Sequence, residues 1–184
     1  NARQSGCVLN LQSSDRVLGS LPLFHAFGLT VTTLMPLLIG TPVIFYPDPT
    51  DAKGVARAIA TYEVTVLCGT STFLNLYSRH PKVSGLMFQS LRLVISGAER
   101  LAESVRSSFK DKFNLEIYQG YGATETSPVA SFNLPDILVK EDWHIQISHK
   151  PGSVGLPVPG TSFCIVDPVS FEILPTGQEG LLLI

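Results

Sequence analysis

The stretch "LRLVISGAERLAESVRSSFKDKFNLEIYQ", Leu91 to Gln119, decides the fold class of this chain. It begins with an apolar run, Leu91–Gly97, and ends with another, Leu115–Gln119, and both are typical of buried strands. Between them, apolar residues recur at every fourth position, as on one face of a helix: Leu101, Val105, Phe109 and Phe113. A strand, a helix and a second strand in this order predict a βαβ unit with parallel strands.

The same alternation extends toward the start of the chain. Strand-type runs are Arg16–Leu21, Thr41–Tyr46 and Val64–Gly69, and helix-type runs are Gly28–Ile39, Ala52–Tyr62 and Ser71–Arg79. This order predicts an α/β layered domain whose sheet is mostly parallel. The run Gly28–Ile39 is apolar nearly all round, so we expect it to be buried.

The pattern changes after about Pro128. The segment Asn133–Lys150 is polar and mixed, which predicts a long loop. Thr161–Asp167 and Glu179–Ile184 resemble strands, and a "PTGQEG" turn separates them. We therefore divide the chain into a central α/β part, residues 1–150, and the start of a smaller β-rich subdomain, residues 151–184.

Composition excludes several classes of protein. The 184 residues, 45% of them hydrophobic, can bury a core of their own. A net charge of −2 without a basic stripe argues against a nucleic-acid partner. The sequence contains no run of about 18 apolar residues, which is the length that a membrane-spanning helix needs. Cys7, Cys68 and Cys164 are far apart and form no C-x-x-C, which argues against a disulfide scaffold or a zinc site.

Three predicted strands end in small and polar residues. In a parallel sheet the carboxyl ends of neighbouring strands meet at one edge, where ligands bind. That rule brings together Gly69–Thr72, Ser96–Glu99 and Gly120–Glu125.

The last of these segments has the chemistry of a nucleotide site. Gly120 and Gly122 let the backbone come close to a ligand, and Tyr121 offers a ring for stacking on a base. Thr124 offers a hydroxyl to a phosphate, and the Glu125 carboxylate suits Mg²⁺. The set fits ATP better than a sugar or a peptide. The alternative interpretation is a glycine turn with a capping threonine.

At this point the sequence resembles a known family. "YGATE" followed by "SP" resembles the Y-G-x-T-E motif of the adenylate-forming enzymes, which include acyl-CoA synthetases, peptide-synthetase adenylation domains and luciferases. Four other segments match in the family's order: "LPLFHAFGL" (Leu21–Leu29), "LRLVISGAERL" (Leu91–Leu101), "KPGSVGLPVPG" (Lys150–Gly160) and "PTGQEGLLLI" (Pro175–Ile184). Within the superfamily, the chain is most similar to long-chain acyl synthetases, in particular the acyl-ACP synthetase part of bacterial bifunctional 2-acylglycerophosphoethanolamine acyltransferases.

The resemblance implies ATP and Mg²⁺ as cofactors and a role for each matching residue. The nucleotide-binding residues would be Gly97, Ala98, Glu99, Gln119, Gly120, Tyr121, Gly122 and Thr124. The acyl pocket would be formed by His25, Gly28, Gly69, Thr70, Ser71 and Ala123. The catalytic residues would be Thr124, Glu125 and His25, with Glu125 holding the metal.

The resemblance also implies the reaction. A fatty acid would be activated as an acyl-adenylate and transferred to the thiol of an acyl carrier protein or of coenzyme A. The protein would be cytoplasmic, with peripheral contact of the full-length protein at the inner face of the cell membrane. Two alternatives stay open: an adenylation domain for another carboxylate, and a non-catalytic nucleotide-binding module. The apolar stretch "LFHAFGL" carries no acid, which favours a fatty or aromatic carboxylate over an amino acid.

We also expect the chain to be a central portion of such an enzyme. The family's phosphate loop, ribose-binding aspartate and mobile C-terminal domain would all lie outside it. The expectation for this polypeptide alone is therefore little or no turnover.

Overall fold

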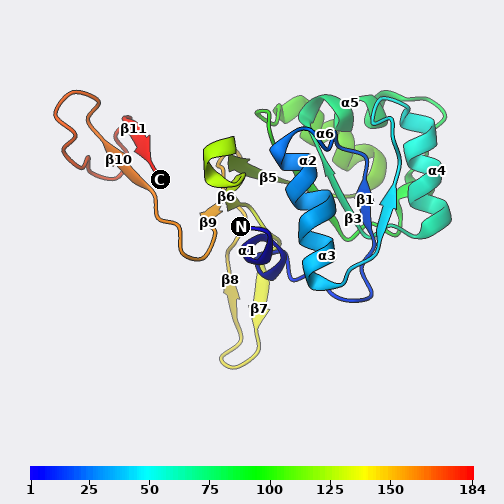
Figure 1. Cartoon of the computed structure of the whole chain (residues 1–184), viewed down its shortest axis with the longest axis horizontal. Helices are drawn as coiled ribbons and strands as arrows, with labels where there is room; N and C mark the ends of the chain where they lie inside the picture. Colours follow the sequence, from blue (N-terminus) through cyan, green and yellow to red (C-terminus); the bar gives the residue numbers. More distant parts are fainter.

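The computed structural model describes residues 1–184 and is built around a seven-stranded sheet (Figure 1). The strands of this sheet are β1 (Val17–Gly19), β2 (Val43–Phe45), β3 (Val66–Gly69), β4 (Leu93–Ser96), β5 (Ile117–Gly122), β6 (Val129–Phe132) and β9 (Leu156–Pro157). Their order is β2-β1-β3-β4-β5-β6-β9. The first five are parallel, and β6 and β9 are antiparallel to their neighbours. The predicted α/β class with a mostly parallel sheet is confirmed.

Helices cover both faces of the sheet. They are α1 (Ala2–Val8), α2 (Ala26–Leu29), α3 (Met35–Ile39), α4 (Ala52–Tyr62), α5 (Ser71–Arg79) and α6 (Glu103–Phe113), with short turns η1 (Thr30–Leu34), η2 (Gly85–Phe88) and η3 (Thr124–Thr126). In Figure 1, α2 and α3 lie in front of β1 and β3, with α5 and α6 behind. No helix is both long and apolar enough to cross a bilayer.

Two hydrophobic cores follow from the alternation of side chains along the strands. Along β3, Val66 and Cys68 face the core shared with α1 and the segment α2–η1–α3, whereas Leu67 faces α4, α5 and α6. The core on the side of α4, α5 and α6 contains an aromatic cluster, in which the rings of Phe88 and Phe113 stack with centroids 4.3 Å apart. The predicted apolar face of α6 is confirmed, since Val105, Phe109 and Phe113 are buried.

A buried carboxylate ties together the amino ends of three strands. Asp15, just before β1, is 3% exposed. It accepts hydrogen bonds from Arg92 Nε (2.7 Å), from the Thr65 hydroxyl (2.7 Å) and from the Gln12 N–H (2.8 Å). Thr65 and Arg92 directly precede β3 and β4, so this network lies at the opposite edge of the sheet from the predicted site.

The helix predicted over Gly28–Ile39 exists, but the prediction that it is buried is wrong. It runs over Ala26–Ile39 as α2, η1 and α3, and ends at Gly40, whose φ is +82°. Only one side packs against the sheet, so four leucines on its other faces stay exposed: Leu29, Leu34, Leu37 and Leu38. The wider η1 turn ends at Leu34, two residues before Pro36, which has no N–H to continue the ordinary helical pattern.

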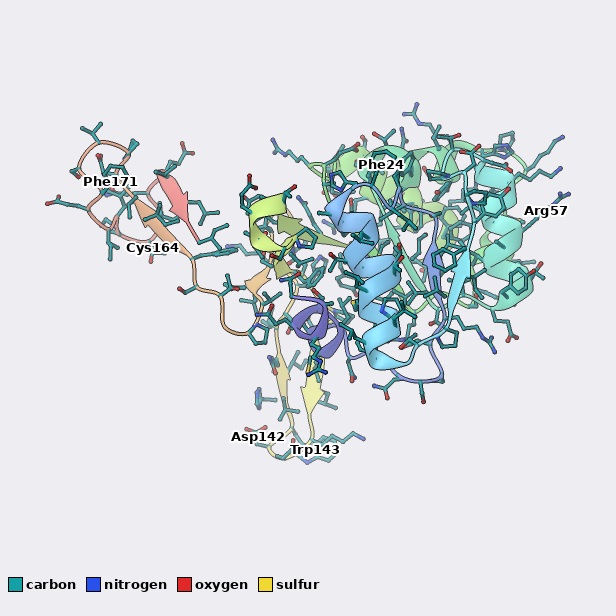
Figure 2. The ribbon with its side chains drawn as sticks, viewed as in Figure 1. Phe24, Arg57, Asp142, Trp143, Cys164 and Phe171 are labelled. Carbon is teal, nitrogen blue, oxygen red and sulfur yellow. The ribbon has the colours of Figure 1, made fainter.

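The segment after Gln119 is more regular than predicted. β5 does not end at Gln119 but continues to Gly122, because β6 pairs with it, matching Gly120 to Phe132 and Tyr121 to Ser131. The long loop predicted over Asn133–Lys150 contains the hairpin β7 (Ile137–Val139) and β8 (His144–Gln146), which corrects that prediction. The hairpin projects from the sheet, with Asp142 and Trp143 at its tip (Figure 2). Its side chains are mostly exposed on both strands, so burial does not alternate between neighbouring residues along them.

The last part of the chain forms a separate antiparallel pair, β10 (Cys164–Val166) and β11 (Leu181–Leu183), as the two strand-like runs predicted. The division near residue 150 stays a prediction. The main sheet extends as far as Pro157 in β9, which argues for a boundary a few residues later.

Candidate functional site

The ends of three parallel strands form one rim, as expected from their order. In the observed register Gly69 of β3 pairs with Ser96 of β4, and Ser96 pairs with Gln119 of β5. The loops that leave these strands therefore lie next to one another.

A cavity of about 180 Å³ opens at this rim. Its lining joins residues from α2, from the end of β4, from the β5–η3 segment and from β6: His25, Phe27, Gly97, Ala98, Gly120, Tyr121, Gly122, Ala123, Thr124, Pro128, Val129 and Phe132. Eight of these residues were predicted as site residues from the sequence.

A larger groove of about 760 Å³ lies beside the cavity. Four residues line both hollows: Ala98, Gly120, Tyr121 and Gly122. The groove adds polar and charged residues, among them Glu99, Arg100, Arg106 and Gln119. Two predicted nucleotide residues, Glu99 and Gln119, thus lie in the groove and not in the cavity.

The wall between the two hollows has an unusual backbone. Ala98 has a φ of +63°, a left-handed conformation that is uncommon for a residue with a side chain and that concentrates at functional sites. On the other strand, a Cβ on Gly122 would lie 1.8 Å from the carbonyl oxygen of Pro128, so only glycine fits there. The Tyr121 ring, 37% exposed, meets the Phe163 ring edge-on with centroids 6.5 Å apart.

The Glu99 side chain is held at the start of α5. Its Oε2 accepts hydrogen bonds from the Thr72 N–H at 3.0 Å and from the Thr72 hydroxyl at 2.9 Å. A carboxylate in this position satisfies a free helical N–H and interacts favourably with the helix dipole. The contribution of Glu99 to a ligand site would therefore come mainly from its backbone.

His25 stands at the mouth of the cavity and begins α2. Its Nδ1 accepts a hydrogen bond from the Phe27 N–H at 3.2 Å, which orients the ring and leaves Nε2 available to a ligand. The side chain is exposed, so it does not serve as a buried core histidine.

Thr124 and Glu125 lie in the η3 turn that follows β5. The turn is held by Thr126, whose hydroxyl donates to the Pro128 carbonyl at 2.6 Å and accepts from the Ala123 N–H at 3.0 Å. Thr124 lines the cavity, whereas the exposed Glu125 lines neither hollow. No cluster of three or more His, Cys, Asp or Glu residues occurs in the chain, so a metal ion here would depend on one carboxylate and on phosphate oxygens.

Four predicted acyl-pocket residues lie away from both hollows: Gly28, Gly69, Thr70 and Ser71. Gly28 is buried against the Pro22 carbonyl, and Thr70 caps α5 by accepting a hydrogen bond from the Phe73 N–H. Ser71 accepts from the Ala102 N–H at 3.4 Å. Their roles in substrate binding stay predictions.

Sequence reasoning missed the aromatic and apolar walls of the cavity and the residue that holds the groove together. Phe27, Val129 and Phe132 line the cavity. The buried Asn133 donates to the carbonyls of Gln119 (3.1 Å) and Ser153 (2.8 Å), so it fastens the 150–155 loop against the middle of β5. Of these residues, only Phe27 could have been suspected from the sequence, because it lies two residues after the predicted site residue His25.

Arg100 and Arg106 line the groove but differ in electrostatic surroundings. Arg106 is paired with Glu116, which also contacts Lys110 at 2.8 Å. Burial alone would raise the pKa of Glu116, but hydrogen bonds from Lys110 and Arg106 bring the pKa below its ordinary value. Arg100 has no ion-pair partner, so its charge remains available to a ligand in the groove.

Comparison with known proteins matches residues 1–184 to the family described as AMP-binding enzyme. The Long-chain-fatty-acid--CoA ligase of Escherichia coli O157:H7 is 32% identical over 170 residues, which are 92% of this chain and 28% of that protein. The Probable 4-coumarate--CoA ligase 2 of Dictyostelium discoideum is 31% identical over 177 residues, covering 95% of this chain and 30% of that protein.

Solved structures of related enzymes have the same fold as this chain. Apo MatB from Rhodopseudomonas palustris superimposes with a TM-score of 0.85 at 26% identity, covering 99% of this chain and 34% of that one. The anthranilate CoA ligase AuaEII in complex with anthranoyl-AMP gives 0.79 at 27% identity, covering 98% and 33%. The chain thus spans about a third of the length of these four proteins. By its five motifs, its sheet and its match over every residue, this chain belongs to the AMP-binding enzyme family.

Proposed function

We propose that this chain is part of an ATP-dependent acid–thiol ligase that activates a fatty or aromatic acid as its acyl-adenylate. The observation that carries the proposal is the pair of hollows that share Tyr121 and its two flanking glycines as a common wall. The larger, polar groove is suited to a nucleotide. The smaller cavity is suited to the acid, so the acid's carboxylate and the α-phosphate would meet at this wall.

The reaction follows from that placement. A carboxylate oxygen attacks the α-phosphorus, the bond to the β-phosphate oxygen breaks, and pyrophosphate leaves. A thiolate then attacks the acyl carbon and AMP leaves. Holding both reactants in place supplies much of the rate, because two bound groups react as one molecule.

The chain's own residues would contribute in distinct ways. Tyr121 stacks on adenine, Thr124 donates its hydroxyl to an α-phosphate oxygen, and His25 orients the acid at the cavity mouth. Apolar walls keep water from the reactive anhydride. Glu125 would hold Mg²⁺, and this fits because Mg²⁺ commonly takes one or two carboxylates together with substrate phosphates. When bound, Mg²⁺ neutralises phosphate charge.

The relatives favour coenzyme A as the acceptor, since three of the four compared above are named CoA ligases. The acyl-carrier-protein acceptor predicted from the sequence is the second candidate. Acyl transfer assays with each thiol on one preparation of the whole protein that carries this chain would distinguish them.

The experiment that tests the site compares two exposed tyrosines in that whole protein. Tyr121→Ala removes the proposed adenine platform, and Tyr62→Ala removes a tyrosine of α4 that lines neither hollow. Base stacking on an aromatic ring is worth about 1–3 kcal/mol, so Tyr121→Ala should raise KM for ATP about tenfold or more in a pyrophosphate-release assay. Tyr62→Ala should leave it unchanged. Equal KM values in both variants would refute the assignment of the groove.

A further inference from the structure

Resting on the proposed function, we infer that Asn133 is a positioning residue for the nucleotide in the larger groove. Its side chain does not line the groove. It joins two segments that do, the 150–155 loop and the part of β5 that carries Gln119 and Tyr121. Asn133 thus acts on ATP binding through the backbone that it holds in place.

The two segments supply different parts of the groove. Gln119 and Tyr121 belong to β5, whereas Gly152 and Val154 belong to the loop. The loop residues line the groove but not the smaller cavity. A shift of the loop would therefore change the nucleotide site and leave the lining of the cavity in place.

The Asn133 side chain uses its full hydrogen-bonding capacity to join these segments. An asparagine amide has two N–H donors and an oxygen that can accept two bonds. Nδ2 donates to the carbonyls of Gln119 at 3.1 Å and of Ser153 at 2.8 Å. Oδ1 accepts from the Lys150 N–H at 2.9 Å and from the Ser153 hydroxyl at 3.5 Å. Because its donors face carbonyls and its oxygen faces donors, only one orientation of the amide satisfies all these groups.

The buried position of Asn133 makes these bonds hard to replace. The residue is 2% exposed, so a carbonyl that loses its partner there does not readily bond to water instead. The main-chain N–H of Asn133 also donates to the Gln119 carbonyl, at 2.9 Å. This second bond does not depend on the side chain. A substitution at Asn133 should therefore keep β5 and β6 together and release the loop.

The same loop has a second polar attachment. The Ser131 side chain, in β6, is fully buried, and its hydroxyl donates to the Val154 carbonyl at 2.7 Å. The loop also comes close to the backbone of β6, since a Cβ on Gly155 would lie 2.0 Å from the Phe132 carbonyl oxygen. The two attachments, from Ser131 and Asn133, can be removed one at a time.

The test measures pyrophosphate release by the whole protein that carries this chain, with benzoate, octanoate and palmitate as acids. Asn133→Ala removes the amide, and Asn133→Asp keeps its size but replaces the donating nitrogen by an oxygen. Both should raise KM for ATP by about tenfold, because buried carbonyls lose their partner and the loop moves. KM for the acid should change by less than about twofold, since a rise in KM confined to one substrate reports lost binding of that substrate.

Two further variants separate positioning from a general loss of stability. Ser131→Ala removes the second attachment and should also raise KM for ATP, by a smaller factor. Tyr77→Phe is the matched control: Tyr77 is buried, lines neither hollow, and its hydroxyl donates to the Pro49 carbonyl at 2.9 Å. This variant should lower the melting temperature and leave both KM values unchanged. Amide hydrogen exchange over residues 150–155 should be faster in Asn133→Ala than in Tyr77→Phe.

The outcomes distinguish the inference from the proposed function. An unchanged KM for ATP in both folded Asn133 variants would overturn the inference and leave the ligase standing. An equal rise in Tyr77→Phe would also overturn it, because the effect would then be one of stability. If neither Asn133 variant folds, Ser131→Ala decides, and an unchanged KM for ATP there would overturn the inference. No pyrophosphate release by the wild type with any of the three acids would overturn the proposed function, on which the inference rests.

Discussion

Replacing Asp15 by asparagine should make the stability of this chain less dependent on acidity. Asp15 is buried beneath the amino ends of β1, β3 and β4 and is bound by the Arg92 guanidinium. Burial by itself would raise its pKa, but hydrogen bonds from Arg92, Gln12 and Thr65, together with the charge of Arg92, lower it from 3.8 to about 2. The amide of the Asp15→Asn variant would keep the shape of the side chain and lose its charge.

The sign and the size follow from the pKa. Because the folded pKa lies below the unfolded one, the charged carboxylate stabilises the fold above about pH 4, and this contribution is lost as the pH falls toward 2. The shift corresponds to about 2.5 kcal/mol at about 1.4 kcal/mol per pKa unit. Arg92 is 41% exposed, and solvent screening reduces the expected contribution to about 1–2 kcal/mol.

The assay is urea unfolding of the wild type and the variant, followed by circular dichroism, at several values between pH 7 and pH 2. The wild type should lose about 1–2 kcal/mol more than Asp15→Asn over that range. A constant offset from the new amide cancels, since only the change with pH is compared. Glu63→Gln breaks the exposed pair with Arg16 and should cost under about 0.5 kcal/mol throughout. Parallel curves for wild type and Asp15→Asn would refute the reasoning.

Four further outcomes are expected. Phe88→Ala, which empties the centre of the aromatic cluster beneath α6, should lower the free energy of unfolding by about 3–5 kcal/mol, measured by urea titration. Gly155→Ala should cost more than about 1 kcal/mol in the same titration, because its φ is +83° and a Cβ would lie 2.0 Å from the Phe132 carbonyl. Gly122→Val should abolish pyrophosphate release by the whole protein while far-ultraviolet circular dichroism stays near that of the wild type, since the side chain would strike the Pro128 carbonyl. Glu125→Gln should raise the Mg²⁺ concentration for half-maximal pyrophosphate release several-fold, whereas Glu63→Gln should not; equal values would argue against Glu125 as the metal ligand.

The helices that the sequence predicts best are those with strong local signals. α4 and α5 begin and end at the predicted residues. Asp51 accepts a hydrogen bond from the Gly54 N–H at 2.9 Å at the start of α4, as its place before the apolar pattern suggests. Such signals lie within a few residues of the element they define, so they are visible without a partner.

The predictions that failed concern pairings between distant segments. β6 and the last residues of β5 exist because they bond to each other, and "PVASF" alone carries no sign of that partner. The same holds for the β7–β8 hairpin, which has no buried face to give an alternating pattern. The α2–η1–α3 segment is a failure of the opposite kind, because its apolar residues suggested burial but several of its leucines are exposed. The sequence alone does not reveal which apolar residues the rest of the protein will cover.

By itself, the sequence determined the α/β class and the edge of the sheet at which the predicted site residues gather. Strand and helix periods are local, and the carboxyl ends of parallel strands must share an edge, so the glycines and polar residues that follow them come together in any such sheet. Only the tertiary structure decided how large the cavity is, which rings line it and which predicted residues stand apart from it. Those features depend on distances between segments remote in the chain, such as Phe27 and Gly97, and such distances are set by the packing of a helix across the sheet.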